Sequence, residues 1–318
     1  MRRICLLCTA ALILVIHSHF LLERAAPALL APFALLRPPS TASGSGCAPR
    51  GLRPHVLVYN RLEKTGSSTL YSLIDALAVR NNFTHVRLQD FYNATAANAA
   101  IGAALLQPQR SLVSEHFAFP EHLEEGLKGR VSYMQVVRAP VERCVSWYHW
   151  SRYSWPNPWT QRNLALYGNA TLDECMAPAA AGGSTPACLN CPPLHQAQAF
   201  CGANGGQCHD GTMGSTLVLQ QAARHIEAHY PIVGLTEQLE ATLALLEVTF
   251  PQFFEGALAA FKHPDFRSQR VFKGRAARYP HPSNATRRLL SQHLRGEEQL
   301  YAQLAARLAA QKACLERW

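Results

Sequence analysis

The residues best suited to chemistry lie in a basic, hydroxyl-rich turn that directly follows an apolar run, VLVYN, at residues 56–60. This lysine turn, residues 61–69, reads RLEKTGSST and leads into a helical pattern with leucine or isoleucine at positions 70, 73, 74 and 77. Its candidate ligands are Lys64, Thr65, Gly66, Ser67, Ser68 and Thr69. The first N–H groups of a helix and the helix dipole attract anions, and Lys64 adds a positive charge. The lysine turn therefore predicts a binding site for an anion.

A nucleotide P-loop, G-x-x-x-x-G-K-[ST], is the first alternative for such a turn. Glu63 and Val58 stand where that motif has its two glycines, and the long loop that wraps a triphosphate is missing. A smaller anion is therefore favoured, and a P-loop kinase or nucleotidase is disfavoured. A simple Ser/Thr-rich helix cap is the second alternative, but the position directly after an apolar strand favours binding. We expect the carboxylate of Glu63, which is unusual beside an anion, to point away.

Two further strand ends carry polar side chains. Arg138 ends the apolar run of MQVVRAPVERCVSWYHW, Pro140 suits the first helical position, and Ser146 lies eight residues after Arg138. His116 follows the run SLVSE, and a neutral imidazole suits a general base because its pKa lies near working pH. Each of these residues could by itself be an ordinary strand-end or helix-surface residue. Ligands of parallel sheets collect at the carboxyl ends of the strands, where all three groups are expected.

Taken in order, these motifs resemble those of PAPS-dependent sulfotransferases, and more closely those of the uronyl and heparan sulfate 2-O-sulfotransferase family. The similarity covers residues 54–315 and includes LDEC at 172–175, FCG at 200–202 and VGLTEQLEATLALLE at 233–247. It implies an α/β fold of the P-loop-like sulfotransferase type. It also implies transfer of a sulfuryl group from PAPS (3'-phosphoadenosine 5'-phosphosulfate) to the 2-hydroxyl of a uronic acid in a glycosaminoglycan.

The same resemblance implies a role for each candidate residue. The 5'-phosphosulfate of PAPS is expected at residues 64–69, and its 3'-phosphate at Arg138 and Ser146. His116 is expected to act as the general base, in line with the sulfuryl group. Lys64 is expected to neutralise the leaving oxygen, so that no metal is required.

The composition agrees with a polyanionic partner, because the formal net charge is +9 and the pI is about 9.2. Arg61 resembles a family position that contacts the acceptor sugar or assists catalysis, and Lys273 could close over PAPS. Arg152, Arg162 and the basic residues of 267–278 could line a groove for the polymer, or form an ordinary solvated face.

The acceptor stays open among iduronate in dermatan, glucuronate in chondroitin, iduronate in heparan and another acidic polymer. Because the heparan relatives assemble as trimers, the resemblance also implies a homotrimer, and it implies no nucleic-acid partner. A second hypothesis is a catalytically inactive polysaccharide-binding protein with the same fold. The heparan enzymes have a second histidine where this chain has Ser114, and the family often has proline where this chain has Glu63.

Five of the ten cysteines crowd into residues 175–208, a pattern typical of disulfides in an oxidising compartment. A zinc site is disfavoured, because Cys188-x-x-Cys191 has no second CxxC or histidine pair to complete it. Five cysteines cannot all pair among themselves, so one stays free or joins Cys47, Cys144 or Cys314. The resemblance implies a Cys201–Cys208 bond, and a bond from Cys175 to either Cys188 or Cys191.

The N-terminus predicts a membrane anchor. Arg2 and Arg3 precede an uncharged stretch, residues 4–22, which is just long enough to span a bilayer and is oriented by the positive-inside rule. A cleaved signal peptide is the alternative. We expect a cytosolic tail at 1–3, a signal anchor at 4–22, a stem at 23–53 and a lumenal sulfotransferase domain at 54–318, in a single-pass type II protein of the Golgi membrane. Four sequons for N-glycosylation, at Asn82, Asn93, Asn169 and Asn284, agree with a lumenal body.

The elements that position these residues follow from hydrophobic periodicity. Apolar runs predict short buried strands at His55–Tyr59, Val86–Leu88, Ser111–Glu115, Val131–Val137 and Ile232–Gly234. Helical patterns lie between them, and one long helix is expected near residues 286–315. This alternation predicts an α/β fold with a mostly parallel sheet and helices on both faces.

Overall fold

The computed structural model describes residues 47–317, except for 90–91, 121–128, 154–157, 203–206, 210–211 and 269–279. The predicted cytosolic tail, the anchor, most of the stem and Lys273 lie outside these residues. Within the described ranges, no helix combines the length and the apolar character needed to cross a bilayer.

In the described residues, five parallel strands form one sheet in the order β2-β3-β1-β4-β5. The strands are β1 (Val56–Asn60), β2 (Thr84–Arg87), β3 (Ser111–Glu115), β4 (Val131–Val137) and β5 (Ile232–Leu235). The α/β prediction is confirmed, and the sheet is wholly rather than mostly parallel. All residues of β1 and β3 are buried, which a parallel strand covered on both faces requires.

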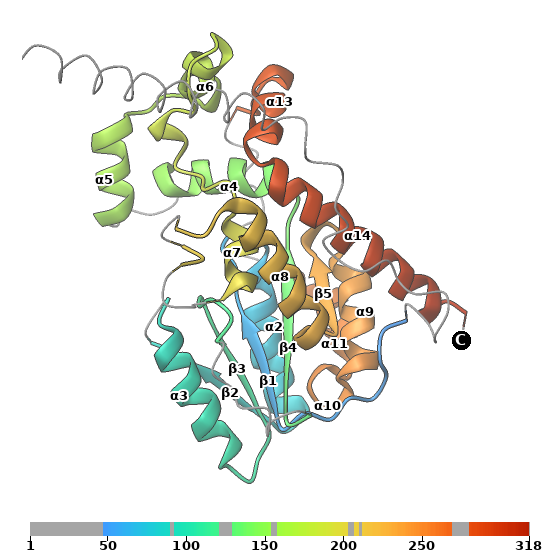
Figure 1. Ribbon diagram of the computed structural model, residues 1–318. Coiled ribbons are helices and arrows are strands. Elements are labelled where there is room, and N and C mark those ends of the chain that lie inside the picture. The colour runs from blue at the N-terminus through green and yellow to red at the C-terminus, as the bar shows by residue number, and fades with distance from the viewer. Residues whose placement is uncertain are drawn as a thin grey trace, which may run out of the picture. The chain divides into compact units, whose positions relative to one another are not determined.

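Helices cover both faces of this sheet, with α2 (Ser67–Arg80) behind it and α8 (Ser215–His229) in front of it in the view of Figure 1. The direction in which the chain adds strands to the sheet changes next to β1. The chain first passes from β1 to the edge strand β2 through α2, and it returns to β3 through α3 (Ala94–Leu105). It then continues on the other side of β1, where β4 leads directly into α4 (Pro140–Tyr153). In such sheets, the crevice at this reversal is the usual ligand site.

The remaining helices are mostly short. They are α5 (Pro158–Tyr167), α6 (Leu172–Ala180), α7 (His195–Cys201), α9 (Leu239–Thr249), α10 (Pro251–Phe254), α11 (Ala257–Lys262) and α12 (Pro264–Ser268). Two 3-10 turns lie at Ala187–Leu189 and Thr236–Gln238.

The expectation of a single helix near 286–315 is wrong. The chain forms α13 (Asn284–His293) and α14 (Arg295–Leu315), which are separated at Leu294. The regularly spaced residues Leu290, Leu294, Leu304 and Leu308 are all buried. The two helices pack on different neighbours: α13 packs on α6 and α4, whereas α14 packs on β5 and α9. Gly296 allows the start of α14 to approach Leu194 closely, because a β-carbon at position 296 would lie 2.9 Å from the Leu194 side chain.

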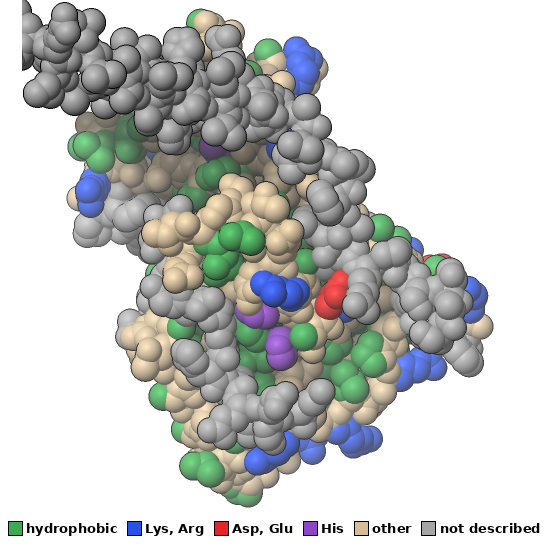
Figure 2. All heavy atoms as spheres, in the orientation of Figure 1, with side chains coloured by type: hydrophobic (Ala, Val, Ile, Leu, Met, Phe, Trp, Pro, Cys, Tyr) green, Lys and Arg blue, Asp and Glu red, His purple; other side chains and the backbone are tan. Residues whose placement is uncertain are grey.

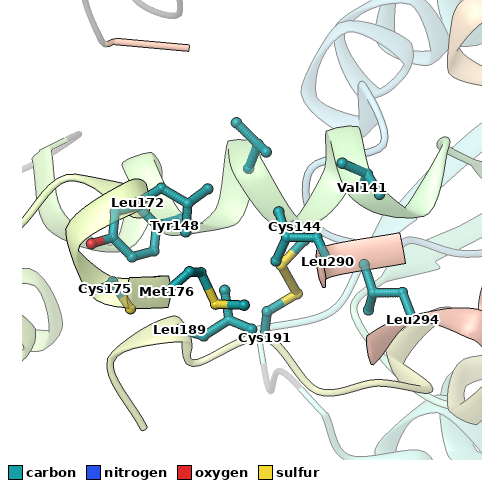
Figure 3. Close-up of a cluster of buried hydrophobic side chains, with 11 residues drawn as sticks. Val141, Cys144, Tyr148, Leu172, Cys175, Met176, Leu189, Cys191, Leu290 and Leu294 are labelled. Carbon is teal, nitrogen blue, oxygen red and sulfur yellow. A yellow bond between two sulfur atoms is a disulfide. The ribbon is translucent and has the colours of Figure 1, made fainter. Parts of the chain in front are cut away.

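A separate hydrophobic cluster lies between α4, α6, α13 and the segment before α7 (Figure 3). Tyr148 of α4, Met176 of α6 and Leu290 of α13 meet there. The cluster fixes α4, and thereby the segment that follows β4, on the rest of the fold.

Four disulfides join the described cysteines. The structure pairs Cys201 with Cys208, and Cys175 with Cys188 rather than with Cys191. The fifth cysteine of the crowded stretch, Cys191, is bonded to Cys144 on α4 (Figure 3). Cys47 is bonded to Cys314, near the end of α14.

Three of the four sequon asparagines, Asn82, Asn169 and Asn284, have exposed side chains. Asn93 caps α3, because its side-chain oxygen accepts a hydrogen bond from the backbone N–H of Ala96. Glycosylation at Asn93 therefore competes with a structural role.

Candidate active site

The lysine turn connects β1 to α2 through two residues with left-handed backbone conformation, Lys64 (φ 66°) and Gly66 (φ 77°). Glycine adopts this conformation freely, but for lysine it is uncommon. Gly66 is the N-cap of α2, and no side chain caps that helix. No side chain therefore occupies the start of α2, where helix N–H groups attract anions, although the N–H of Thr69 already donates to the carbonyl of Gly66 at 3.0 Å.

The hydroxyl groups of the lysine turn differ in what they can do. Thr65 is 1% exposed, and its hydroxyl donates to the carbonyl of Leu62 at 3.0 Å, so that this side chain holds the turn together. Ser68 is exposed, Thr69 is half-buried and Ser67 is buried in the first turn of α2. The expected contribution of Thr65 to ligand binding is thus limited to its backbone.

Arg138 lies against the lysine turn, as the sequence predicts from the position of both at strand ends. Its Nη1 donates to the carbonyl of Lys64 at 3.1 Å. Burial and the neighbouring Arg138 lower the pKa of Lys64 to about 8, while Glu63 opposes this shift. Ser146 is half-buried on α4, two helical turns beyond Arg138.

The backbone of Arg138 is held by Gln196 of α7. The side-chain amide of Gln196 accepts from the N–H of Arg138 and donates to its carbonyl, both at 3.0 Å. Glu297 of α14 in turn accepts hydrogen bonds from the backbone and side chain of Gln196. Nothing in the local sequence marks Gln196 or Glu297, because their role arises only when α7 and α14 pack beside β4.

A second set of hydrogen bonds that holds the ends of the strands comes from the 3-10 turn after β5. The hydroxyl of Thr236 lies 2.7 Å from the carbonyl of Thr65 and 3.1 Å from that of Val137, and can donate to either. Glu237 accepts from the backbone N–H of Ala139 at 3.0 Å. These residues belong to the VGLTEQ stretch, and they connect the lysine turn to the end of β4.

His116 is placed at the end of β3, with its imidazole oriented toward the backbone of the lysine turn. Its Nδ1 lies 3.1 Å from the carbonyl of Arg61. Because a carbonyl can only accept, Nδ1 carries the proton and Nε2 carries the lone pair. Burial lowers the pKa of His116, so that the imidazole is neutral at neutral pH. Nε2 is therefore suited to accept a proton from a substrate.

Arg61 forms a buried ion pair with Glu115, with 3.2 Å between Nη1 and Oε1. Its guanidinium also lies over the ring of Tyr71, at 4.2 Å from the centroid. Glu115 is the last residue of β3 and lies next to His116. Arg61 thus fixes the end of β3 beside the lysine turn, whatever it contacts in an acceptor.

Ser114, which stands where the heparan relatives have a second histidine, is fully buried. Its hydroxyl lies 2.7 Å from Nε2 of His85, and Nδ1 of His85 lies 2.7 Å from Asp75. The three side chains have the order of a serine-hydrolase triad, but no substrate can reach a serine with 0% exposure. They connect β3, β2 and α2 as a hydrogen-bonded chain that runs from the buried Ser114 to the partly exposed Asp75.

Glu63 does not point away, contrary to expectation. Its side chain is 11% exposed, and its Oε2 lies 2.7 Å from Nε2 of His195. The hydroxyl of Tyr92 donates to Oε1, which also lies 3.8 Å from Nδ1 of His116. Burial alone would raise the pKa of Glu63. The hydrogen bond from His195, the electrostatic interactions with the His195 and His116 imidazoles and the hydrogen bond from Tyr92 outweigh burial and lower that pKa far below its usual range.

Aromatic side chains of α4 border the same site. The Nζ of Lys64 lies 5.5 Å from the centroid of the Trp150 ring, and the Trp147 ring lies 6.3 Å from that of His195. A cavity of about 450 Å³ opens at the N-terminal end of α4. It is lined by Ala139, Val141, Glu142, Asn284, Arg287, Arg288, Ser291 and Glu298, and by none of the predicted ligand residues.

The basic residues expected in a polymer groove separate into different environments. Arg152 is 1% exposed, stacks on Tyr148 and donates to the carbonyls of Tyr148 and Cys188, so that its proposed groove role is wrong. Arg162 is exposed, and the side chains of the basic residues in 267–278 lie outside those described. Figure 2 shows the face that carries α8, where the described Lys and Arg side chains are scattered rather than gathered in one patch. Across the described part of the chain, no cluster of His, Cys, Asp or Glu is arranged to hold a metal ion.

Comparison with known proteins gives a family match for the part of the chain that contains the lysine turn, His116 and Arg138. A model of the Sulfotransferase family matches residues 52–191. The uronyl 2-sulfotransferase homolog pip of Drosophila melanogaster is 28% identical over 281 residues, which are 81% of this chain and 53% of that protein. Heparan sulfate 2-O-sulfotransferase 1 of Gallus gallus is 30% identical, and that of Homo sapiens 29%, each over 65% of this chain and 58% of the relative.

Over residues 52–191, the chain is similar to the sulfotransferase family. It is distantly homologous to the uronyl and heparan sulfate 2-O-sulfotransferases. The matched part spans about half the length of these curated relatives.

Proposed function

We propose that the protein transfers a sulfuryl group from PAPS to the 2-hydroxyl of a uronic acid in a glycosaminoglycan. The observation that supports this most directly is the meeting of three groups at the ends of adjacent parallel strands. Lys64 follows β1, His116 follows β3, and Arg138 follows β4 and donates to the carbonyl of Lys64.

The residues present fit PAPS. The uncapped N-terminus of α2, the ammonium of Lys64 and the exposed hydroxyl of Ser68 suit the 5'-phosphosulfate. Arg138 and Ser146 suit the 3'-phosphate, because a guanidinium and a hydroxyl are both donors to phosphate oxygens. When bound, PAPS supplies the sulfuryl group and a phosphate leaving group.

The roles of the protein side chains follow from their charge states. The neutral Nε2 of His116 accepts the proton of the acceptor hydroxyl while the acceptor oxygen bonds to sulfur. As the bond between sulfur and the phosphate oxygen breaks, its electron pair leaves with that oxygen. The ammonium of Lys64 stabilises the charge that develops there.

The acceptor and the compartment are inferred from the relatives and from composition. The relatives are named for uronyl and heparan sulfate 2-O-sulfation, and a net charge of +9 suits an acidic polysaccharide. Four disulfides favour the secretory pathway. A Golgi location, the anchor at residues 4–22, lumenal orientation and a homotrimer complete the proposal.

The test uses the full-length chain with radiolabelled PAPS and a panel of selectively desulfated heparan, dermatan and chondroitin. We expect label to appear on a uronic acid 2-hydroxyl, and disaccharide analysis of the product identifies which one. His116→Ala should lower the rate by about 10²- to 10⁴-fold, because the general base is lost, while binding of PAP (3'-phosphoadenosine 5'-phosphate) persists.

Two other results would each point to a different function. Binding of a polysaccharide without transfer by the wild-type chain supports an inactive lectin-like protein. Transfer that requires ATP and magnesium supports a kinase.

A further inference from the structure

The proposed chemistry assigns no role to Glu63, although three side chains lie around its carboxylate. They come from three separate segments: His195 from α7, Tyr92 from the segment before α3, and His116 from the end of β3. A buried carboxylate beside a site for a polyanion repels that ligand, so its placement opposes binding. Such a placement needs a compensating contribution to the reaction, and the geometry around His116 supplies one.

We propose that Glu63 is a positioning residue whose carboxylate, fixed by His195 and Tyr92, stabilises the positive charge that forms on His116 during proton transfer. The proposal rests on the proposed function, because it concerns the same general base. In this arrangement Nδ1 of His116 lies near the carbonyl of Arg61 and, at 3.8 Å, the Oε1 of Glu63, while Nε2 lies 3.9 Å from Oε1 of Glu115. Glu115 is itself paired with Arg61, whose positive charge opposes its effect on His116.

Glu63 acts on His116 through space rather than by a hydrogen bond, because 3.8 Å is too long for one. The imidazole is neutral before the reaction and becomes positive as Nε2 takes the proton. A fixed negative charge at this distance therefore interacts more strongly with the transition state than with the ground state. Interactions of that kind raise kcat rather than ground-state affinity.

Two hydrogen bonds hold the carboxylate of Glu63 in place. Nε2 of His195 holds one carboxylate oxygen at 2.7 Å, and the Tyr92 hydroxyl donates to the other. Tyr92 also stacks on the His116 ring, and its backbone N–H donates to the carbonyl of His116. Tyr92, although it is 67% exposed, thus contacts both Glu63 and His116.

Glu63 also supports the second charged group of the site. It opposes the burial that lowers the pKa of Lys64. Five titratable or charged groups face Glu63 from the elements around it: Lys64 in the turn, Tyr92 before α3, His116 after β3, Arg143 in α4 and His195 in α7. Its removal should therefore lower the pKa of both His116 and Lys64.

The kinetic test compares Glu63→Gln with the wild-type full-length chain over about pH 5 to about pH 9, with labelled PAPS and the preferred glycosaminoglycan. We expect kcat to fall roughly 10- to 100-fold while the KM for PAPS does not rise, because one stabilising charge at about 4 Å is lost and so is a repulsion. Both limbs of the pH profile should move to lower pH. The matched control is Glu240→Gln, which removes a half-exposed carboxylate paired with Lys262 and should change neither kcat nor the profile.

A second measurement follows the imidazole itself. In the chain labelled with nitrogen-15 histidine and free of PAPS, the His116 resonance should titrate at lower pH in Glu63→Gln than in the wild type. Tyr92→Phe removes only the hydroxyl donor and keeps the ring, so it should lower kcat in the same direction by a smaller factor. This variant provides the test if Glu63→Gln fails to fold.

The outcomes separate the two proposals. A wild-type chain that transfers no sulfuryl group overturns the proposed function, and the role of Glu63 in it falls as well. An active wild type, combined with a Glu63→Gln variant of unchanged kcat, pH profile and His116 titration, overturns the positioning role alone.

Discussion

Sulfuryl transfer requires different protonation states of two side chains in the candidate active site. His116 must be neutral to accept a proton, and Lys64 must be charged to stabilise the leaving oxygen. Burial lowers the pKa of both groups. For His116 this shift favours the active form, whereas for Lys64 it brings the inactive form closer to neutral pH.

This difference predicts a bell-shaped dependence of kcat/KM on pH. The acid limb should lie below the ordinary histidine pKa of 6.5, because His116 becomes protonated only at lower pH. The basic limb should fall through about pH 8, as Lys64 loses its proton. Initial rates at low concentrations of substrate report these values for the free enzyme.

Lys64→Arg provides the control for the basic limb. A guanidinium stays charged to above about pH 12, so the variant, although slower, should keep its relative activity beyond pH 8. A basic limb at the same pH in Lys64→Arg and the wild type would assign that limb to another group.

At the scale of single residues, the sequence predicts the functional residues that lie at or just beyond the ends of strands. Lys64, His116 and Arg138 could be found because parallel strands of one sheet end at a common edge. Glu63, by contrast, was expected to point away, and His195 and Gln196 carry no local signal. Their positions depend on how α7 packs, and this packing is determined by contacts between residues far apart in the sequence.

At the scale of elements, the lysine turn depends on the 3-10 turn that follows β5. Thr236 reaches the carbonyls of Thr65 and Val137, and therefore connects the ends of β1, β4 and β5 with one hydroxyl. The strands themselves were predictable from short apolar runs. The break at Leu294 was not, because the apolar spacing continues through it and only the different partners of α13 and α14 require it.

Thr236→Val should weaken the binding of PAP. Valine keeps the shape of threonine, but it leaves two buried carbonyls without this donor, which costs about 1–2 kcal/mol in the free energy of unfolding. Isothermal titration with PAP and urea unfolding measure the two effects. Thr236→Ser, which keeps the hydroxyl, should retain most of the affinity for PAP. Equal affinities of the two variants would show that the Thr236 hydroxyl does not support the binding site.

At the scale of the whole described body, disulfides hold together parts that the sheet does not connect. Cys144–Cys191 joins α4 to the segment that leads into α7. It therefore links the helix after Arg138 to the helix that supplies His195 and Gln196. The sequence could name Cys144 only as one of three partners for the unpaired cysteine, because the choice depends on the folded position of α4.

The loss of this bond should cost more stability than the loss of the short one. Cys144 and Cys191 are separated by 47 residues and Cys201 and Cys208 by 7. Loop-closure entropy then predicts about 4 kcal/mol for the Cys144→Ala/Cys191→Ala variant and about 2.4 kcal/mol for Cys201→Ala/Cys208→Ala. Urea unfolding of both variants measures the difference. A larger loss for the short loop would contradict this account.

The bond between Cys47 and Cys314 has a mechanical consequence. Their Cα atoms lie 5.3 Å apart, at the start of the described body and near the end of α14. Tension that arrives along the chain ahead of Cys47 passes through this covalent bridge into the longest helix, before it can pull on β1. The central strand is therefore shielded from being peeled out of the sheet, and the strand ends that carry Lys64 and His116 keep their alignment under load.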